Sequence, residues 1–332
     1  MANPPKILIN GFGRIGRSIL RILMQDRAEF DLVGINDIEP LDICAYLFEF
    51  DSVYGTWSGT VEMEEDALVV DGRRIPFTQV PDISALSIDG LDVVLECTGL
   101  SGDRAFEERG LVAGARNVLV SGPCDSADAT VVLGANDHDL AQHKIVSNAS
   151  CTTNALAPLI KVLDDAYGVE SGHMTTVHCY TSSQPTVDQP RRNMARSRAA
   201  ALSMVPTTTS AHRLLGAVLP KMSGRIEARA IRVPTASVSA IDLTVQTSNK
   251  VTVEEVNGLL SEQAEKAGII GWIDRPLVSS DLRARSESVI MSGLETSVSK
   301  GGLLRVFGWY DNEWGFSNRM LDMAARMAAR EF

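Results

Sequence analysis

A cysteine inside a polar run, followed later by a histidine, has the residue types needed for nucleophilic chemistry. Cys151 lies in Ser147–Asn154 (SNASCTTN), between an apolar run and a segment with helical spacing. A cysteine at the start of a helix is close to the positive end of its dipole, which stabilises a thiolate. The next strand-like segment carries His178, and a nearby histidine can activate such a nucleophile. Most cysteines are small buried hydrophobic residues, but the Ser, Asn and Thr around Cys151 are not typical of a core.

A glycine motif near the start has the types and context of a dinucleotide-binding turn. Gly11, Gly13 and Gly16 form GxGxxG directly after the apolar run Lys6–Asn10 and open the helical pattern Arg14–Met24. In such motifs the first glycine permits a tight turn, the second lets the backbone approach a pyrophosphate, and the third lets the helix pack closely. The pyrophosphate lies at the helix N-terminus.

An acidic residue follows the second strand, as this kind of site requires. Asp37 comes directly after Leu32–Asn36, about 20 residues beyond the glycines, where a carboxylate can bind ribose hydroxyls. A helix or turn cap is the structural alternative for Asp37. The carboxylate would repel a 2′-phosphate, so NAD is favoured over NADP. Thr98 and Gly99 follow the strand-like Val93–Cys97 and should lie at the same carboxyl edge of the sheet.

The elements that position these residues fall into two groups. Before residue 150, short apolar runs alternate with helical patterns, which predicts a Rossmann-type, doubly wound parallel sheet. The predicted strands are Lys6–Asn10, Leu32–Asn36, Val93–Cys97, Asn117–Ser121 and Ile145–Ser147, with helices at Arg14–Met24 and Leu41–Phe48. After residue 150 a long helix, Thr153–Tyr167, precedes β-rich runs at His173–Tyr180, Arg225–Val233 and Ser237–Gln246. This part is predicted to be an α+β catalytic domain with a large mixed or antiparallel sheet.

The predicted division of the α/β chain follows from this change of character. Residues 1–150 are expected to form the NAD-binding domain, joined by a C-terminal helix within 315–332, and residues 151–314 the catalytic domain. The stretch Thr181–Ser203 is rich in Arg, Ser and Pro. An irregular segment of that length inside a compact domain is usually functional or interfacial.

Composition limits the classes of function that remain for this protein. Among 332 residues, 31 Lys and Arg against 42 Asp and Glu give a net charge of −11, which disfavours a nucleic-acid or anionic-membrane binder. The five cysteines form no CxxC pair, so neither a metal site nor a disulfide framework is expected. No apolar run approaches a membrane span of about 20 residues, and the first residues do not resemble a signal peptide. We expect a cytoplasmic protein with reduced thiols.

Several motifs together resemble one enzyme family. They are INGFGRIGR, IND, FDSVYG, SNASCTTN, TTVH, RVPT (Arg232–Thr235) and WYDNEWGFSNR (Trp309–Arg319). In order and spacing they are similar to the glyceraldehyde-3-phosphate dehydrogenase family over essentially the whole chain. The resemblance implies a phosphorylating, NAD-dependent aldehyde oxidation in glycolysis or glucose metabolism. Cys151 would form a thiohemiacetal and then a thioester, His178 would act as acid and base, and inorganic phosphate would release the acyl phosphate.

The resemblance also assigns roles to individual residues. The residues implied for the cofactor are Gly11, Gly13, Arg14, Ile15, Gly16, Asp37, Thr98, Gly99, Ser121 and Asn312, the last holding the nicotinamide carboxamide. Thr181 and Arg232 would bind the C3 phosphate of glyceraldehyde 3-phosphate. Ser150, Thr152, Thr209 and Ser210 would bind inorganic phosphate. The loop Thr181–Ser203 resembles the family's loop that reaches a neighbouring subunit, which implies a homotetramer.

Some positions depart from the common family pattern. Ala155 stands where a second cysteine is usual, Ser210 replaces a glycine, and Phe316 replaces a tyrosine. His212 and Arg213 follow Ser210 in place of Ala-Lys, so the acyl acceptor, phosphate or arsenate, is less firmly implied than the oxidation. An erythrose-4-phosphate dehydrogenase, a semialdehyde dehydrogenase and a non-catalytic NAD-binding or redox-sensing protein are the alternatives. The combined presence of Cys151, His178, Arg232 and Asn312 argues against the last of these.

Overall fold

The computed structural model describes residues 4–100, 102–140 and 143–329, and the chain divides into two compact units. The first unit comprises Met1–Val131, Asp137–Ala149 and Ser317–Phe332, and the second comprises Val132–Asn136 and Ser150–Phe316. In these units, residues 132–136 group with the second unit and the returning C-terminal segment starts at Ser317; the expected domains, 1–150 with 315–332 and 151–314, remain a prediction.

The sheet of the first unit has nine strands in the order β10-β11-β9-β8-β1-β2-β7-β6-β5, and β10 through β7 are parallel. The strands are β1 Lys6–Asn10, β2 Asp31–Asn36, β5 Val61–Glu64, β6 Ala67–Val70, β7 Arg73–Thr78, β8 Val93–Glu96, β9 Asn117–Val120, β10 Ala129–Thr130 and β11 Ile145–Ser147, with β3 Phe50–Asp51 and β4 Gly55–Thr56 paired separately. Central strands are buried on both faces, as in β8, and such strands appear as continuous apolar runs. The five predicted strands are therefore present. The antiparallel addition β5–β7 was not predicted.

Helices of the first unit are α1 Arg14–Gln25, α2 Leu41–Glu49 and α3 Arg104–Val112, with short η1 Ile83–Ala85 and η2 Asp137–Leu140. The C-terminal helix α7, Trp314–Ala328, begins in the second unit and continues into the first. It is tied to the first unit by Arg27, which forms an ion pair at 2.8 Å with Asp322, and by Arg116, which donates to the carbonyl of Ala328 at 3.0 Å. The predicted terminal helix is thus integral to this unit.

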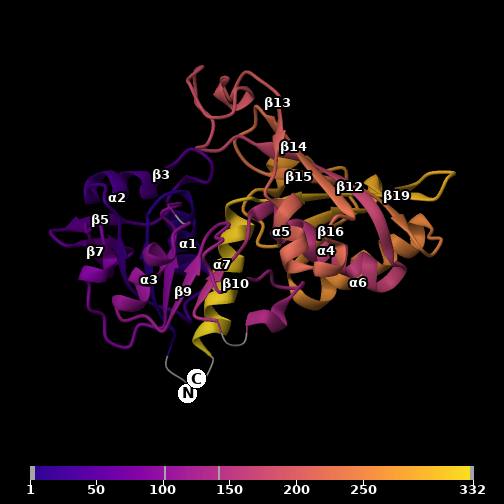
Figure 1. Ribbon diagram of the computed structural model, residues 1–332. Coiled ribbons are helices and arrows are strands. Elements are labelled where there is room, and N and C mark those ends of the chain that lie inside the picture. Colours follow the sequence, from indigo (N-terminus) through magenta and orange to yellow (C-terminus); the bar gives the residue numbers. More distant parts are fainter. Residues whose placement is uncertain (1–3, 101, 141–142, 330–332) are drawn as a thin grey trace. The chain divides into compact units, whose positions relative to one another are not determined.

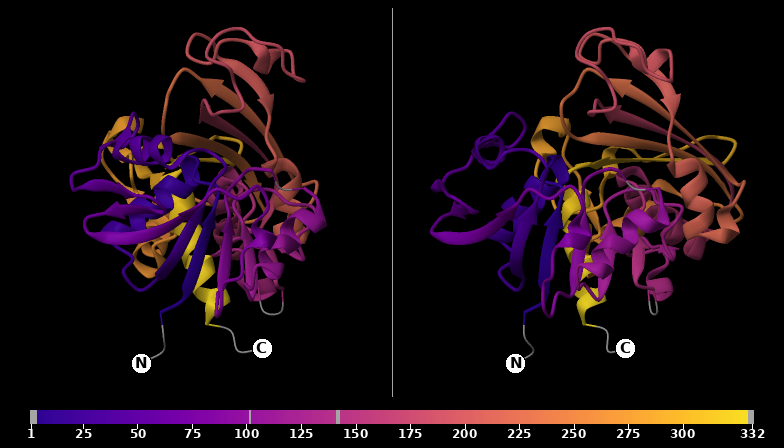
Figure 2. Two further views of the ribbon diagram at one scale, coloured as in Figure 1. Left: turned by 90° about the vertical axis from the view of Figure 1, so that its left-hand side faces the viewer. Right: turned by 60° about the vertical axis from the view of Figure 1, so that its left-hand side comes forward.

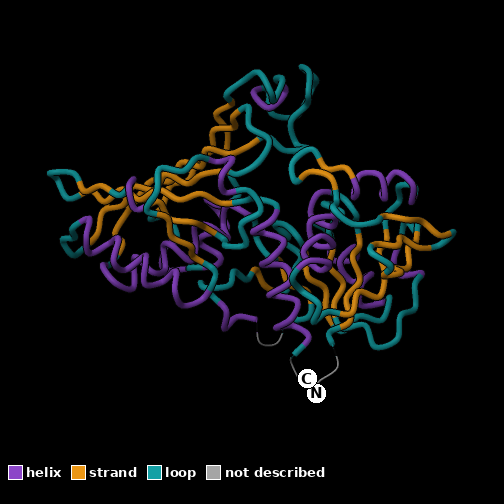
Figure 3. The backbone as a smooth tube through the Cα atoms, turned by 180° about the vertical axis from the view of Figure 1, so that it is seen from behind, coloured by secondary structure: helices purple, strands orange, loops and turns teal. Residues whose placement is uncertain are grey.

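The second unit is built on a mixed eight-stranded sheet with the order β13-β14-β12-β15-β19-β17-β16, and β18 pairs with β19. The strands are β12 Val169–Cys179, β13 Val205–Thr208, β14 Ile226–Val233, β15 Ser239–Thr247, β16 Ile270–Ile273, β17 Val289–Ser292, β18 Ser297–Val298 and β19 Leu303–Tyr310. Helices α4 Cys151–Tyr167, α5 Ala211–Val218 and α6 Val253–Ala267 lie along one face of this sheet (Figures 1 and 3). The short helices are η3 Ala195–Ser197, η4 Pro220–Met222, η5 Ser279–Leu282 and η6 Gly293–Glu295.

Long-range register places two predicted site residues side by side. Strands β12 and β14 are parallel neighbours, and His178 is the register partner of Arg232. The segment 180–204, which connects β12 to β13, extends beyond that end of the sheet in the turned views (Figure 2). It carries strongly exposed apolar side chains, among them Met194 and Leu202. Among the described residues no helix is both long and apolar enough to cross a membrane.

Candidate active site

The glycine motif forms a tight turn between β1 and α1. Gly11 has φ +94, and a Cβ there would lie 2.5 Å from the backbone nitrogen of Thr98, so only glycine fits without strain. A Cβ on Gly16 would lie 2.3 Å from the carbonyl oxygen of Gly11. A Cβ on Gly13 would meet nothing within 4 Å, which leaves its backbone open to a ligand. These three environments fit the pyrophosphate-binding role expected of the motif.

A pocket of about 330 Å³ opens beside this turn in the first unit. Of the predicted cofactor residues, Gly11, Gly13, Asp37 and Thr98 line it. Arg14, Ile15, Gly16, Gly99 and Ser121 do not, and the Arg14 guanidinium pairs with Asp51 instead. Lining residues that the sequence did not predict are Asn10, Asn36, Ile38, Glu39, Val80, Pro81, Cys97, Leu100, Phe106 and Arg109.

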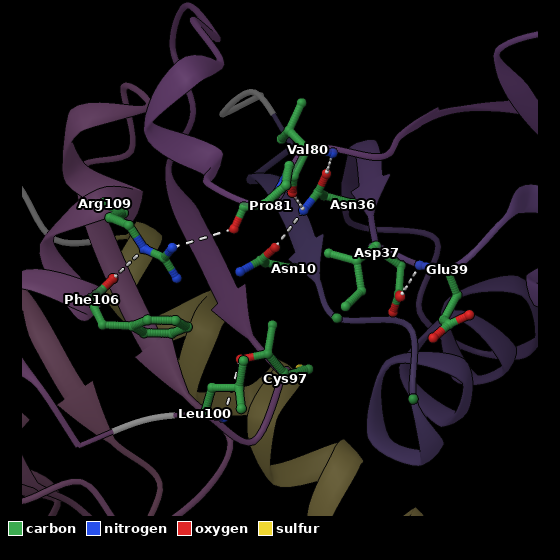
Figure 4. A pocket seen from close by; sticks show the side chains of 14 residues that line it. Asn10, Asn36, Asp37, Glu39, Val80, Pro81, Cys97, Leu100, Phe106 and Arg109 are labelled. Atoms are coloured by element: carbon green, nitrogen blue, oxygen red, sulfur yellow. Dashed lines mark hydrogen bonds between the residues drawn. The ribbon is translucent and has the colours of Figure 1, made fainter.

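Asp37 is fixed at the edge of this pocket by backbone donors. One carboxylate oxygen accepts from the N–H of Phe12 and the other from the N–H of Glu39 at 2.9 Å. Figure 4 shows Asp37 and Glu39 on one side of the pocket, with Phe106 and Arg109 on the opposite side. Asp37 therefore caps its turn, the structural alternative, and also lines the pocket where a ribose would be bound.

A buried polar network lies beneath the pocket. Asn36 donates to the side-chain oxygen of Asn10 at 2.8 Å, and Asn10 donates to Glu96 at 2.6 Å (Figure 4). Glu96 also accepts from the backbone N–H of Thr98 at 2.9 Å. Burial raises the pKa of Glu96 despite these donors. The network joins the carboxyl ends of β1, β2 and β8 and holds the pocket floor in one arrangement.

In the second unit, Cys151 is the first residue of α4. Ser150 caps this helix, its hydroxyl accepting from the N–H of Thr153 at 3.2 Å. The Cys151 sulfur lies 3.7 Å from Nε2 of His178, which is 4% exposed on β12. The nucleophile and base proposed from the sequence are therefore in contact, although they are separated by a whole helix and strand.

The protonation states of Cys151 and His178 are governed by burial. Burial, together with the nearby positive charge of Arg232, lowers the pKa of His178 to about 3. Burial also raises the pKa of the Cys151 thiol, outweighing the opposite influence of Arg232 and Thr152. In this geometry desolvation is stronger than the helix dipole, so the pair is a neutral thiol and a neutral imidazole at pH 7. The helix dipole, which favours a thiolate, is therefore outweighed by burial at Cys151.

Arg232 controls which nitrogen of His178 carries the proton. Its NH1 group lies 2.7 Å from Nδ1 of His178 and donates to the carbonyl of Cys179 at 3.0 Å. Nδ1 itself lies 2.7 Å from the same carbonyl. An arginine can only donate, so contact with Arg232 places the proton on Nε2. Withdrawal of Arg232 lets Nδ1–H donate to the carbonyl and leaves Nε2 to accept a proton.

A pocket of about 470 Å³ surrounds Cys151 and has the character of an anion site. Its lining includes Ser150, Cys151, Thr152, His178, Thr209, Ser210 and Arg232 from the predicted set, and also Arg196, Thr208, Arg213 and Ala230. Helices α4 and α5 both begin at this pocket, and helix N-termini favour anions. Arg196 is held by Thr207 at 2.9 Å and by the carbonyl of Thr208 at 2.8 Å. Arg196, on η3, and Arg213, on α5, were not predicted as ligands, although the Arg-rich segment Thr181–Ser203 and the change of family residue at position 213 were signals that could have indicated them.

Two predicted residues lie outside this pocket. Thr181 is not part of the lining, and its hydroxyl pairs with that of Ser183 at 2.9 Å. Asn312 is 7% exposed and its side-chain oxygen contacts Cys179 and Ser239. Phe316, the departure from the family's tyrosine, is a buried side chain that is 5% exposed.

A chain of hydroxyls supports the start of α4 from below. The hydroxyl of Tyr310 lies 2.9 Å from that of Thr152 and 2.8 Å from that of Thr176. All three side chains are nearly inaccessible. Tyr310 therefore joins β12 and β19 to the first turn of α4, directly behind Cys151.

Comparisons with known proteins agree with this architecture. The chain matches "Glyceraldehyde 3-phosphate dehydrogenase, NAD binding domain" over residues 5–104 and "Glyceraldehyde 3-phosphate dehydrogenase, C-terminal domain" over residues 150–312. It is 46% identical over 328 residues to a glyceraldehyde-3-phosphate dehydrogenase of Xanthobacter flavus, with 97% of this chain and 98% of that protein covered. Similar proteins of the same name come from Pseudomonas aeruginosa (45% identity, 98% of both chains) and, as glyceraldehyde-3-phosphate dehydrogenase 1, from Bacillus subtilis (42%, 98% of both).

Fold and matches together define an NAD-dependent oxidoreductase with an α/β fold. The chain belongs to the glyceraldehyde 3-phosphate dehydrogenase family. The resemblance, the fold class and the cofactor predicted from the sequence are thereby confirmed.

Proposed function

We propose that this chain oxidises D-glyceraldehyde 3-phosphate with NAD through a thioester on Cys151, and that inorganic phosphate then accepts the acyl group to give 1,3-bisphosphoglycerate. The observation that carries the proposal is the 3.7 Å contact of Cys151 with His178 in a pocket that also contains Arg196, Arg213 and Arg232. A thiol beside a neutral base can add to an aldehyde, and the arginines can hold phosphate groups.

The first step adds the Cys151 sulfur to the aldehyde carbon, and the thiol proton reaches the carbonyl oxygen to give a thiohemiacetal. His178 relays this proton, and its Nε2 with the backbone N–H of Cys151 stabilises the negative charge that develops on the oxygen. Bound NAD would supply the acceptor for the hydride that leaves the same carbon. His178 takes the hydroxyl proton as the carbonyl re-forms, which leaves a thioester. Inorganic phosphate then attacks that carbonyl carbon and displaces the Cys151 sulfur.

Residues of the first unit would hold the cofactor. Gly11 and Gly13 at the start of α1 suit the pyrophosphate, and Asp37 suits the ribose hydroxyls. Thr98 lines the same pocket, and Arg14, Ile15, Gly16, Gly99 and Ser121 remain predicted contributors. Asn312 is proposed to hold the nicotinamide carboxamide.

Anion binding is divided between two groups of residues. We assign the C3 phosphate of the substrate to Arg232 and Thr181. Inorganic phosphate is assigned to Ser150, Thr152, Thr209 and Ser210 at the starts of α4 and α5. When the substrate phosphate draws Arg232 away from Nδ1, His178 gains the tautomer that a base requires, because Nδ1–H then donates to Cys179.

The assembly and location follow as parts of the same proposal. Exposed Val187, Met194, Leu202 and Met204 in the segment 180–204 suit burial against other copies of the chain, in the expected homotetramer. The five free cysteines suit a reducing, cytoplasmic environment. The first unit is proposed as the NAD-binding domain and the second as the catalytic domain.

Formation of NADH at 340 nm tests the activity. Wild-type protein should oxidise glyceraldehyde 3-phosphate steadily with phosphate, and without phosphate it should give a burst with Cys151 acylated, as detected by mass spectrometry. Cys151→Ser should lose several orders of magnitude in rate and keep NAD binding, because a serine hydroxyl is scarcely ionised at neutral pH. Three results would contradict the proposal: preference for erythrose 4-phosphate, steady turnover that arsenate supports and phosphate does not, or near-normal activity of Cys151→Ser.

A further inference from the structure

Cys179, which follows His178 on β12, is a buried thiol with a polar partner. It is 1% exposed, and its sulfur lies 3.0 Å from the side-chain oxygen of Asn312. Burial raises the pKa of this thiol to about 12. The group is therefore protonated throughout the working pH range and acts as a hydrogen-bond donor.

Ser239 favours the same direction of the Asn312 amide as Cys179. The Ser239 hydroxyl oxygen accepts from the backbone N–H of Cys179 at 3.1 Å. Its proton is directed to Asn312, whose side-chain oxygen lies 3.3 Å away. Two donors, the Cys179 thiol and the Ser239 hydroxyl, thus meet at one atom of the Asn312 amide. Of the two ends of that amide only the oxygen can accept a hydrogen bond, so the oxygen faces both donors.

The other end of the Asn312 amide remains available. Within residues 4–100, 102–140 and 143–329, no group forms a hydrogen bond with its Nδ2. The side chain is 7% exposed, so this NH₂ group is held in a rigid, largely desolvated setting. A preorganised donor of this kind is suited to a single acceptor on a ligand.

We propose that Cys179 is a positioning residue for the cofactor: with Ser239 it locks Asn312 so that its NH₂ group is offered to the carbonyl oxygen of the nicotinamide carboxamide. The inference rests on the proposed role of Asn312. It adds the direction of the contact and identifies the side chain that enforces it.

Binding of NAD to four proteins tests the inference by isothermal titration calorimetry: wild type, Cys179→Ala, Cys179→Ser and Asn312→Ala. Cys179→Ala removes one of the two donors and leaves the weaker Ser239 contact alone to orient the amide, so the Kd for NAD should rise about 2- to 10-fold, the usual value of one hydrogen bond. Cys179→Ser keeps an O–H donor and should recover most of the affinity. Cys124→Ala is the matched control, because this buried thiol contacts Glu107 and Ser126 in the first unit.

The 3-acetylpyridine analogue of NAD tests the direction of the contact. It keeps the carbonyl oxygen and lacks the NH₂ group, so wild type should bind both dinucleotides within about 3-fold, and Cys179→Ala should weaken both by the same factor. A wild-type protein that binds the analogue at least about 10-fold more weakly than NAD would overturn the direction.

Alkylation of Cys151 by iodoacetamide without NAD separates positioning from damage to the neighbouring His178. Cys179→Ala should alkylate at the wild-type rate. An altered rate, together with a Kd that Cys179→Ser does not restore, would make Cys179 merely structural. If Asn312→Ala binds NAD normally, the proposed role of Asn312 fails. If Asn312→Ala weakens binding while Cys179→Ala does not, this inference alone fails.

Discussion

Replacing Tyr310 with phenylalanine should destabilise the protein without leaving a cavity. The change removes one hydroxyl, which contacts Thr152 at 2.9 Å and Thr176 at 2.8 Å. Each lost hydrogen bond is worth about 1 kcal/mol, and a buried partner left unpaired costs about 1–3 kcal/mol. Thr176 is 0% exposed and cannot turn to water. We expect the free energy of unfolding to fall by about 2–4 kcal/mol, measured by urea denaturation.

Matched variants make this prediction specific. Tyr167→Phe, at the partly exposed end of α4, should change the free energy of unfolding by less than about 0.5 kcal/mol. Thr176→Val combined with Tyr310→Phe should cost less than the sum of the single changes, because the two hydroxyls share one bond. The hydroxyl of Thr152 would also lose its orientation, so the KM for inorganic phosphate should rise. A loss below 0.5 kcal/mol for Tyr310→Phe would refute the reasoning.

Three further outcomes are expected. Gly11→Ala should unfold at a clearly lower urea concentration because its Cβ would overlap Thr98, whereas Gly13→Ala should keep wild-type stability and lose NAD affinity in calorimetry. Equal losses of stability in the two variants would contradict the roles given to the two glycines. Arg232→Leu should reduce kcat/KM for glyceraldehyde 3-phosphate by more than about 100-fold, and far more than for unphosphorylated glyceraldehyde, since a charge-assisted contact is lost. Equal losses on both aldehydes would exclude a phosphate-binding role for Arg232. Burial lowers the pKa of His178 from 6.5 to about 3, so the free energy of unfolding should fall as the pH drops from 6.5 towards 3, by up to about 1.4 kcal/mol per pH unit. His178→Asn should flatten that pH dependence, and an unchanged slope would show that His178 does not titrate in this range.

The first unit was largely predictable because its signals are local. Central strands buried on both faces are apolar runs, and the turn at Gly11–Gly16 needs residues of fixed type at fixed spacing. The antiparallel strands β5–β7 were not predicted, since partly exposed segments such as Val61–Glu64 carry no continuous apolar run. Arg109 and Phe106, at the pocket wall, come from a helix whose approach to Pro81 depends on tertiary packing.

In the pocket around Cys151, the two residues proposed to be reactive were predictable, but their surroundings were not. Cys151 and His178 stand in recognisable polar and β-rich contexts. Arg196 and Arg213 reach the pocket from η3 and from α5; the sequence marked both regions as unusual, but their approach to Cys151 depends on tertiary packing. The neutral state of Cys151 and His178 also could not be foreseen, because burial depends on the packing of both around Arg232.

The register of β12 and β14 has a consequence for how substrate length could evolve. His178 and Arg232 are paired across adjacent parallel strands. The hydrogen-bonded pairing of the two strands therefore sets the separation between the proposed base and the proposed phosphate ligand. A slip of one residue would turn either side chain to the opposite face of the sheet. Changes in loops can therefore alter the affinity for the substrate. Acceptance of an aldehyde that is one carbon longer requires a new anion ligand elsewhere in the pocket.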